Sequence, residues 1–406
     1  MKICGVIVEY NPFHNGHIYH LKKARELTNC DAVLAVMSGN FVQRGMPSIM
    51  DKWKRAKLAL NNGVDLVLEL PSIYSLSSAE FFAFGAVSLL NGLNIVSDLC
   101  FGSECGDLNI LHEIAKILNL EPYEYTTILK KHLNKGLSYP LARNNALKEF
   151  ILRDTAKSSI DFASILNNSN NILGIEYCKS LLKLNSSINP ITITRKGCNY
   201  SDLILSQEFS SASAIRNYLK NKSDLNHLEN FIPKDLYASL VQLQKQNYNL
   251  TFGENMFPYI KYKLLTENNC LKKLPDVSEG LDHKIIKEIY KSNSLEELIL
   301  NIKSKRYSYT RINRILAQIY IGFDNYNTKE LRKVPCPYAR VLGFNKIGQR
   351  VLKELKSNSC LPIITKIPKN TNNTLNLDIL STKAYSILNP SVSPTSDYII
   401  SPTIVK

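Results

Sequence analysis

The chain has 406 residues, of which 44% are hydrophobic and 21% are charged, and its formal net charge is +15. A chain of this length is too long for one ordinary core, so we expect two or three domains of a soluble globular protein. The charge favours a polyanionic partner, nucleic acid before an anionic membrane, with a basic solvated surface as the alternative.

Neither the apolar segments nor the cysteines indicate a membrane or secreted protein. No apolar stretch approaches the roughly 20 residues of a membrane-spanning helix. Glu9 interrupts the apolar run near the N-terminus, which therefore does not resemble a signal peptide. The nine cysteines are scattered, without a Cys-x-x-Cys pair. We predict a reduced, cytoplasmic protein without a structural zinc site.

The first strand and the turn after it carry the most informative pattern. Residues 4–8 form a predicted buried strand that must end by Asn11-Pro12, because proline cannot continue a strand ladder. A helix then begins near Gly16, and its N-terminal N–H groups, at the edge of an α/β sheet, favour a bound nucleotide phosphate. Three of the seven histidines, His14, His17 and His20, lie at this turn. This concentration argues against a chance pair of surface histidines.

A second predicted strand, 32–37, ends in the glycine- and proline-marked loop 38–47. The carboxyl ends of parallel strands meet at one edge, so this loop should lie over the same cleft, where Gln43 and Arg44 could reach phosphate or the substrate. An ordinary strand-to-helix connection is the alternative, but such connections are usually shorter. The cations predicted to face solvent from the next helix are Lys52, Lys54, Arg55 and Lys57.

Two further strands complete the predicted sheet. Residues 64–70 and 95–101 have the buried-strand pattern, and Gly102 lets the backbone approach a ligand closely. We expect this glycine loop to contact the adenine or ribose of a bound nucleotide. Strands alternate with helices four times, which is typical of an α/β, Rossmann-like fold with a doubly wound parallel sheet.

The segment after the fourth strand is predicted to be helical. Residues from about 107 to 165 should form a helical insertion that covers the cleft. Asn170 and Asn171 then precede an apolar helix; one asparagine suffices as its N-cap, which leaves the other to contact ligand. Arg195 follows a short predicted strand, where it is well placed for phosphate or acid recognition.

Residues 209–216 have serines at a predicted helix start and an arginine one turn later. The serines could simply cap the helix, but hydroxyls, free N–H groups and a guanidinium at one N-terminus also form a phosphate cradle. Ser213 and Arg216 are the residues that we expect to hold the phosphate. We predict a catalytic domain over 1–220 and a mostly helical, basic domain over 221–406.

Within the second domain, residues 303–314 gather five cations with two tyrosines. Cations for phosphates and aromatic rings for stacking are what recognition of single-stranded RNA needs. A solvated helix face would explain the arginines but not the tyrosines. Residues 337–344 and 361–366 are predicted strands of a small terminal α/β unit. The expected RNA-binding residues are Lys305, Arg306, Tyr307, Arg311 and Arg314.

These segments together resemble a known family. The His-x-Gly-His pattern of residues 14–17 after an N-terminal strand is similar to that of the nucleotidyltransferase superfamily. The longer string VEYNPFHNGHIYH, with MSGNFVQRG, FGSE, NNILGIEY, SSASAIR and KRYSYTR, resembles the bacterial tRNA(Met) cytidine acetate ligase family over essentially the whole chain. Ser169 stands where this family is expected to have a proline before the paired asparagines.

The resemblance implies an ATP-dependent ligase. Acetate would attack the α-phosphate of ATP, with Mg²⁺ present, to give acetyl-adenylate, and the acetyl group would pass to the exocyclic amine of the wobble cytidine of elongator methionine tRNA. His14 and His17 would be the catalytic residues, near the reacting phosphorus, and Arg195 would contact phosphate or the RNA. The residues implied in ATP binding are Ile7, Val8, Glu9, Tyr10, Asn11, Pro12, Phe13, Asn15, Gly16, His20, Gly102, Asn170, Asn171, Arg195, Ser213 and Arg216.

Two other functions stay open on the sequence alone. A nucleotidyltransferase that forms a small adenylylated cofactor would share the N-terminal half but would not need the basic second half. An RNA-binding protein whose nucleotide cleft has lost catalysis would keep both halves. The pattern predicts no resident metal site, and it leaves open the oligomeric state and the residues that contact acetate.

Overall fold

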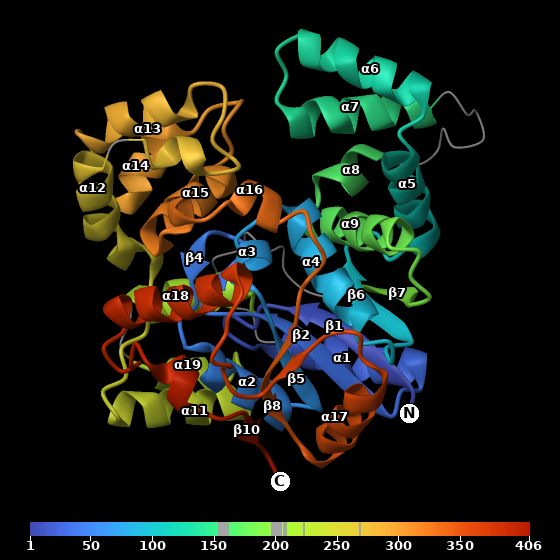
Figure 1. The fold of residues 1–406 in the computed structure, drawn as a ribbon, viewed down its shortest axis with the longest axis vertical. Helices are drawn as coiled ribbons and strands as arrows, with labels where there is room; N and C mark the ends of the chain where they lie inside the picture. The colour runs from blue at the N-terminus through green and yellow to red at the C-terminus, as the bar shows by residue number, and fades with distance from the viewer. Residues whose placement is uncertain (153–161, 196–204, 206–208, 222–223, 268) are drawn as a thin grey trace.

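The computed structural model describes residues 1–152, 162–195, 205, 209–221, 224–267 and 269–406. It has a central sheet with helices packed around it and two groups of helices that extend to one side of the sheet (Figure 1). The strands are β1 (Ile3–Val8), β2 (Ala32–Ser38), β3 (Phe41–Val42), β4 (Met46–Pro47), β5 (Leu66–Leu70), β6 (Asp98–Ser103), β7 (Asn189–Thr194), β8 (Ala339–Phe344), β9 (Ile363–Ile364) and β10 (Thr403–Ile404).

The central sheet has the strand order β10-β8-β5-β2-β1-β6-β7, with β9 beside β8, and β3 and β4 form a separate hairpin. β1 pairs in parallel with β2, and Val8 lies opposite Met37. β6 pairs in parallel with β1 and with β7, and Ser103 lies opposite Thr194. The segments that follow these strands therefore meet at one edge of the sheet. The predicted doubly wound, mostly parallel sheet is confirmed.

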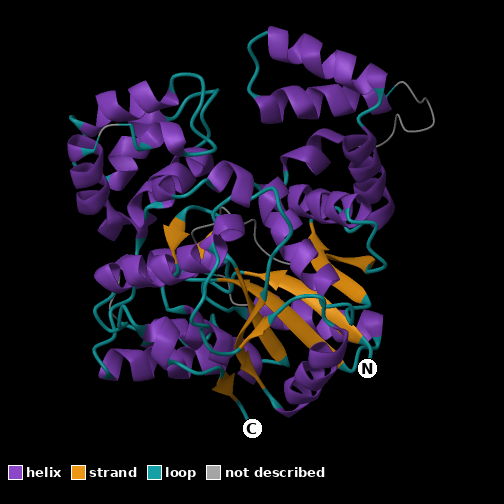
Figure 2. Ribbon diagram, viewed as in Figure 1, coloured by secondary structure: helices purple, strands orange, loops and turns teal. Residues whose placement is uncertain are grey.

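Helices cover the sheet between its strands (Figure 2). Since both faces of the central strands are covered, β1, β2 and β5 are almost continuous apolar runs without polar alternation. The packed helices are α1 (Asn15–Thr28) on β1, β6 and β7, α2 (Lys52–Asn61) on β5, β8 and β10, α4 (Ala79–Gly92) on β5, and α17 (Lys346–Asn358) on β2, β5 and β8, with α3 (Ser72–Ser75) against α4.

Two further groups of helices extend beyond the layers around the sheet (Figure 1). The first includes α6 and α7, which pack on each other at the top of Figure 1, and α9, which packs on α4, α5 and β6. Helices α5 to α7 fall within the range predicted as an insertion and α8 begins in it, whereas residues 153–161 of that range lie outside the described residues. The helices are α5 (Leu108–Leu120), α6 (Tyr123–Asn134), α7 (Tyr139–Ile151), α8 (Phe162–Asn167) and α9 (Ser169–Lys183).

The second group follows β7. Its helices α12 to α15 pack on one another at the upper left of Figure 1. Among the described residues, none of the helices combines the length and the apolar character that crossing a membrane requires. The elements are α10 (Ala212–Asn221), η2 (Asn226–Leu228), α11 (Lys234–Lys245), η3 (Gly253–Met256), α12 (Phe257–Thr266), η4 (Leu271–Lys273), α13 (Leu281–Ile289), α14 (Leu295–Ile302), α15 (Tyr309–Ile321), η5 (Phe323–Asn325) and α16 (Thr328–Leu331), with α18 (Asn373–Leu388) and α19 (Ser396–Ile399) near the C-terminus.

The C-terminal strands do not form a small unit of their own, and that prediction was wrong. β8 pairs antiparallel with β5, with Leu66 opposite Phe344, and β9 and β10 pair with β8. The physical reason is that β5, buried along its whole length, needs a partner on its open side. A short apolar strand does not reveal by its own pattern which sheet it joins.

Helix α2 also departs from expectation, because two of its four cations are buried. Lys52 forms ion pairs with Glu69 at 2.7 Å and with Asp397 at 2.8 Å. Arg55 donates to the carbonyl oxygens of Glu9 at 2.6 Å, Ser38 at 3.1 Å, and Gly39. The carbonyl groups at the carboxyl ends of β1 and β2 need donors once they are buried. Arg55 supplies them and so fixes the sheet edge.

Candidate nucleotide-binding site

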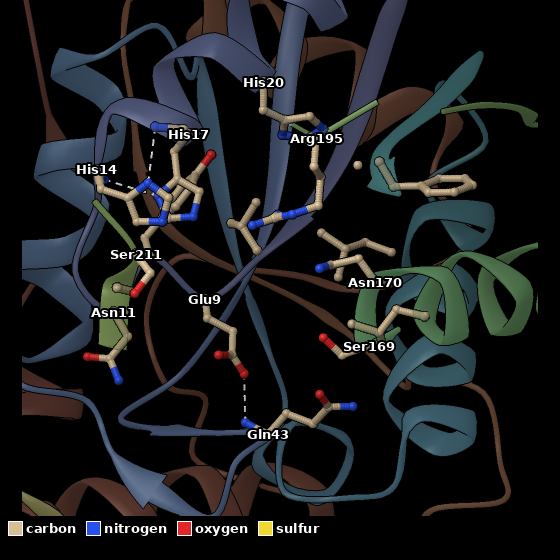
Figure 3. Close-up of a pocket in the computed structure, with 18 of the residues that line it drawn as sticks. Glu9, Asn11, His14, His17, His20, Gln43, Ser169, Asn170, Arg195 and Ser211 are labelled. Carbon is tan, nitrogen blue, oxygen red and sulfur yellow. Dashed lines mark hydrogen bonds between the residues drawn. The ribbon is translucent and has the colours of Figure 1, made fainter. Parts of the chain in front are cut away.

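A cleft of about 360 Å³ lies at the carboxyl edge of the sheet, where β1, β6 and β7 end (Figure 3). Its wall also includes the start of α1, the β3–β4 loop, the start of α9 and the segment before α10, and α15 reaches it from the second half of the chain. The predicted site residues that line it are Ile7, Val8, Glu9, Tyr10, Asn11, His14, Gly16, His17, His20, Gly102, Asn170, Arg195, Arg216 and Arg314.

The two motif histidines hold their rings against the N-terminus of α1. His14 is the N-cap: its Nδ1 accepts a hydrogen bond from Gly16 N–H at 3.1 Å, and His17 Nδ1 accepts one from His14 N–H at 3.1 Å. The rings stack with 3.7 Å between their centroids, and a Cβ at Gly16 would lie 2.9 Å from the His14 ring. Because Nδ1 accepts on both rings, each neutral imidazole carries its proton on Nε2, which can donate to an anion.

Burial keeps these imidazoles uncharged. Burial, with a smaller effect of Arg195 and then Arg216, lowers the pKa of His14 to about 3. Burial, and then Arg195, lowers the pKa of His20 to about 4. The pKa of His17 falls well below its usual range through burial, and then through His14 and Arg195. At pH 7 these rings are hydrogen-bond donors, and the guanidiniums supply the positive charge that a polyanion needs.

Arg216 joins helix α10 to the turn after β1. It donates to the Asn11 carbonyl oxygen at 2.6 Å and to Ser213 Oγ at 3.0 Å. Ser213 is not among the lining residues, so it positions Arg216 and does not face the cleft. Ser211 does line the cleft, and its Oγ accepts a hydrogen bond from Ala214 N–H at 3.0 Å. The serine string predicted a phosphate cradle, and its residues Ser210 and Ser211, rather than Ser213, line the cleft.

Arg195 lies at the end of β7, beside His20 in Figure 3. Its backbone N–H donates to Ser103 O at 3.0 Å, which continues the pairing of β6 and β7. A Cβ at Gly102 would lie 3.2 Å from Arg195 Cγ. The glycine therefore leaves room for the arginine side chain to cross the end of β6 and reach the cleft.

The paired asparagines have different roles. Asn170 lines the cleft and donates from Nδ2 to Glu104 Oε1 at 2.6 Å. Asn171 is buried, and its Oδ1 accepts from the N–H groups of Glu104 at 2.8 Å and Cys105 at 3.1 Å. Asn171 therefore holds the turn after β6, and Asn170 is the asparagine that a nucleoside can reach.

The loop after β2 reaches the cleft as predicted. Gln43 and Arg44 both line it. Gln43 N–H donates to Glu9 Oε1 at 2.7 Å, and Figure 3 shows the Glu9 side chain extending between Gln43 and the histidine side of the cleft. Glu9 is the carboxylate among the described residues that line the cleft.

Five predicted ATP-binding residues are not among the lining residues, and two of them, Asn171 and Ser213, are described above. Phe13 is fully buried, and its ring centroid lies 5.4 Å from that of His17 and 4.8 Å from that of Tyr10. Phe13 therefore supports the motif from within the core and does not face the cleft. The peptide between Asn11 and Pro12 is cis, and the turn that it forms leads into α1. The other three are Pro12, Phe13 and Asn15.

The predicted RNA-binding residues separate into three kinds. Lys305 and Arg306 are exposed at the surface. Tyr307 is buried and donates to Glu279 O at 2.6 Å, so a base has little of its ring to stack on. Arg311 donates to the carbonyl oxygen of Asp276, whereas Arg314 lines the cleft. Sequence reasoning could not separate these roles, because they depend on contacts with other elements.

The fold and this cleft define a nucleotidyltransferase of the His-x-Gly-His type. The sequence matches the HIGH Nucleotidyl Transferase family over residues 1–397. Proteins named tRNA(Met) cytidine acetate ligase are similar over their full length. The one from Clostridium novyi (strain NT) is 55% identical over 406 residues, which cover 100% of both chains. The one from Clostridium kluyveri (strain ATCC 8527) is 53% identical over 405 residues, 100% of this chain and 99% of the relative.

Solved structures agree with these relatives. The crystal structure of TmcAL from Thermotoga maritima without ligand has a TM-score of 0.92 and 35% identity, and each chain is covered completely, at 100%. The structure of the same protein bound with alpha-thio ATP has a TM-score of 0.88 and 34% identity, over 100% of this chain and 99% of that one. The chain belongs to the tRNA(Met) cytidine acetate ligase family within the HIGH nucleotidyl transferases. The resemblance found in the sequence is confirmed.

Proposed function

We propose that this protein is an ATP-dependent ligase that activates acetate as acetyl-adenylate and acetylates the exocyclic amine of the wobble cytidine of elongator methionine tRNA. The observation that carries the proposal is the stacked pair of neutral imidazoles at the N-terminus of α1, in a cleft that Arg195 and Arg216 make cationic. The names of the full-length relatives support the substrate. The ATP analogue bound to the Thermotoga maritima protein supports the nucleotide.

In the first step an acetate oxygen attacks the α-phosphorus of ATP, and the bond to the bridging oxygen of the β-phosphate breaks. Negative charge then develops on the phosphate oxygens. Donors fixed before the reaction stabilise such charge without a cost of reorganisation. His14 and His17 suit this role, because backbone N–H groups hold their Nδ1 atoms and leave Nε2–H to donate. We assign both as catalytic residues.

The leaving pyrophosphate needs a permanent positive charge. Arg216 is suited to hold it, because Ser213 and the Asn11 carbonyl oxygen fix its guanidinium beside the start of α1. Arg195 would contact the triphosphate from the other side of the cleft. Gly102 and Asn170 line the part of the wall that we assign to the nucleoside.

A Mg²⁺ ion would enter with the triphosphate. Among the described residues, no group of three or more His, Cys, Asp or Glu side chains is arranged to hold a metal ion. Mg²⁺ is commonly bound by phosphate oxygens, water and one or two carboxylates, and Glu9 offers one carboxylate in this cleft. The ion would neutralise charge on the phosphates when bound. These ligands therefore fit an ion that binds and dissociates together with the nucleotide.

In the second step the cytidine N4 attacks the acetyl carbonyl carbon, the bond between that carbon and the phosphate oxygen breaks, and AMP leaves. The amine loses one proton, which Glu9 or water can accept. The base must leave its stack to reach the mixed anhydride, as bases do in other enzymes that modify them. The exposed Lys305 and Arg306 would contact the RNA backbone outside the cleft.

We also propose a cytoplasmic location, where methionine tRNA and ATP are present. The division at residue 220 is kept as a functional one: the first part carries the chemistry, and helices α11 to α16 carry the RNA contacts. The last strands are an exception, since β8 to β10 lie in the sheet of the first part.

The decisive experiment is mass analysis of the nucleosides of methionine tRNA after incubation with ATP and ¹³C-acetate, with and without the protein. We expect labelled acetylcytidine only with the protein. Pyrophosphate release from ATP that depends on acetate and occurs without tRNA would support the adenylate. Adenylylation of a small molecule without tRNA acetylation would favour the cofactor-forming alternative. RNA binding without pyrophosphate release would favour a cleft that has lost catalysis.

A further inference from the structure

Helix α15 brings a guanidinium without a partner into the cleft. Arg314 lines the cleft together with Thr310 of the same helix. Within the described part of the chain, its side chain makes no hydrogen bond or ion pair, and its Nε is buried. An unpaired buried cation costs free energy, so such a group normally has a ligand or a counter-ion.

The neighbouring arginines differ from it in this respect. Arg311, one turn earlier, donates to Asp276 O at 2.8 and 3.0 Å. Arg332 forms an ion pair with Asp276 Oδ1 at 2.7 Å. The charged groups with the largest effect on Arg314 are this one carboxylate, whose Oδ1 is paired with Arg332 and whose Oδ2 has no hydrogen-bond partner among the described residues, and the guanidiniums of Arg311, Arg332 and Arg44. The excess of positive charge favours an incoming anion.

The backbone around Arg314 is fixed, so the guanidinium is part of a built site. Asn313 Nδ2 donates to Arg44 O at 2.7 Å. Gly45 has a φ of +78°, and a Cβ there would overlap the backbone of Asn313 and Arg314. The β3–β4 loop and α15 therefore meet backbone to backbone, and each contributes one arginine to the cleft wall, Arg44 and Arg314.

We propose that Arg314 and Arg44 form an anion subsite that binds the phosphodiester next to the target nucleotide of the RNA. The inference rests on the proposed function and specifies how the second substrate enters the cleft. The arginines hold the RNA backbone while the base reaches the acetyl group. Arginine is suited to this task because its planar fork binds two phosphate oxygens at once.

The triphosphate and acetate fit this subsite less well. The cations that lower the pKa of His14 are Arg195 and Arg216, and those that lower the pKa of His17 and His20 include Arg195. Arg44 and Arg314 enter the cleft wall from the β3–β4 loop and α15, whereas Arg216 of α10 is tied to the turn before α1 by its hydrogen bond to the Asn11 carbonyl oxygen. The exposed cations Lys305 and Arg306 lie in the segment that leads into α15.

The test separates the two steps of the reaction. In Arg314→Gln, which removes the charge and keeps a planar polar side chain, we expect acetate-dependent ATP–pyrophosphate exchange within about twofold of the parent. We expect kcat/KM for tRNA to fall by roughly 10- to 100-fold, and the salt dependence of tRNA binding to weaken by about one phosphate contact. Arg314→Lys should recover part of the loss. The matched control is Arg350→Gln, an exposed arginine on α17, which should change neither step.

A second experiment changes the RNA and uses the unaltered protein, so its first measurement does not depend on the folding of a variant. An anticodon stem-loop with one methylphosphonate beside the target cytidine, which lacks that phosphate charge, should be acetylated as poorly as the native RNA is by Arg314→Gln. The same RNA with Arg314→Gln should lose little more, because the two changes remove one contact.

Three outcomes would overturn the inference. If the losses caused by the methylphosphonate and by Arg314→Gln multiply when the two are combined, the phosphate charge and the arginine act independently. A raised KM for ATP or acetate with an unchanged KM for tRNA would assign the subsite to the first step. Full activity of Arg314→Gln on tRNA would remove its role. If the unaltered protein itself fails to acetylate tRNA, the proposed function fails and not this subsite alone.

Discussion

Two regions of the molecule bury charged side chains, and they balance the charge differently. Under α2, Lys52 and Arg340 both contact Glu69 and Asp397, at distances from 2.7 to 3.4 Å. Two cations face two carboxylates, and burial, followed by Glu69, raises the pKa of the neighbouring Asp378 carboxyl to about 7, so the cluster carries little net charge. The described residues that line the cleft include four arginines, Arg44, Arg195, Arg216 and Arg314, and one carboxylate, Glu9. A buried cluster that is neutral supports the fold, whereas one with excess charge is completed by a ligand.

Removing a motif imidazole should have the largest effect on function. For His14→Ala and for His17→Ala we expect acetate-dependent pyrophosphate exchange to fall by about 10²- to 10³-fold, because one fixed donor to the developing phosphate charge is lost. Exchange with labelled pyrophosphate measures this loss. Circular dichroism should show a folded protein in each case. An unchanged rate would mean that these residues take no part in the chemistry. The proposed contrast between the two regions would then fail.

Breaking the neutral cluster should instead reduce stability. Lys52→Met leaves Glu69 and Asp397 with one cation fewer in a fully buried place. We expect a loss of about 3–5 kcal/mol in the free energy of unfolding, measured by urea denaturation. Lys54→Met is the matched control, since Lys54 on the same helix forms a partly exposed pair with Asp51. It should cost less than about 1 kcal/mol. Equal losses for both variants would contradict the proposed difference.

The buried imidazoles also predict how stability depends on pH. In the unfolded chain His20 has its ordinary pKa near 6.5, whereas in the folded protein its pKa is about 4. Between these values the unfolded chain binds more protons, so stability is full above pH 6.5 and is lost as the pH falls towards 4. His20→Gln should flatten the change of the urea midpoint between pH 7 and 5. His283→Gln, at an exposed position, should leave the slope as it is.

The smallest effect is expected at the surface. Replacing Lys305 and Arg306 together by Gln removes two exposed cations that are outside the cleft. We expect tRNA affinity to weaken roughly 3- to 10-fold at physiological salt, with a shallower salt dependence and unchanged pyrophosphate exchange. Filter binding across a salt series measures both quantities. Affinity equal to that of the parent would restrict the RNA contacts to the cleft wall and other helices.

The sequence predicted those features that depend on local pattern. The strand, the turn and the N-terminus of α1 follow from residues 4–17, so the cleft and its histidines could be located in advance. Alternation of strands and helices predicted the sheet. Ser211 and Ser213 show the limit, since the string indicated a phosphate cradle but only the helix geometry decides which hydroxyl faces it.

Features that depend on distant partners were missed. Periodicity identified Lys52 as polar, but its burial follows from Asp397, which lies 345 positions later in the chain. Arg314 was predicted as one of several RNA-binding cations, and its place in the cleft follows from the contact of α15 with the β3–β4 loop. Tyr307 was expected to stack on bases, yet its ring is covered by elements around Glu279. Contacts between residues that lie far apart in the sequence cannot be predicted from a local pattern.

The pairing of β8 with β5 has a consequence for biosynthesis. A nascent chain that has emerged from the ribosome only as far as α16 lacks β8, one of the two neighbours of β5, and until residue 397 follows, Lys52 lacks one of its two counter-ions. The sheet whose edge carries the cleft is therefore complete only after its last strands have been translated. A prematurely terminated product would have an incomplete sheet.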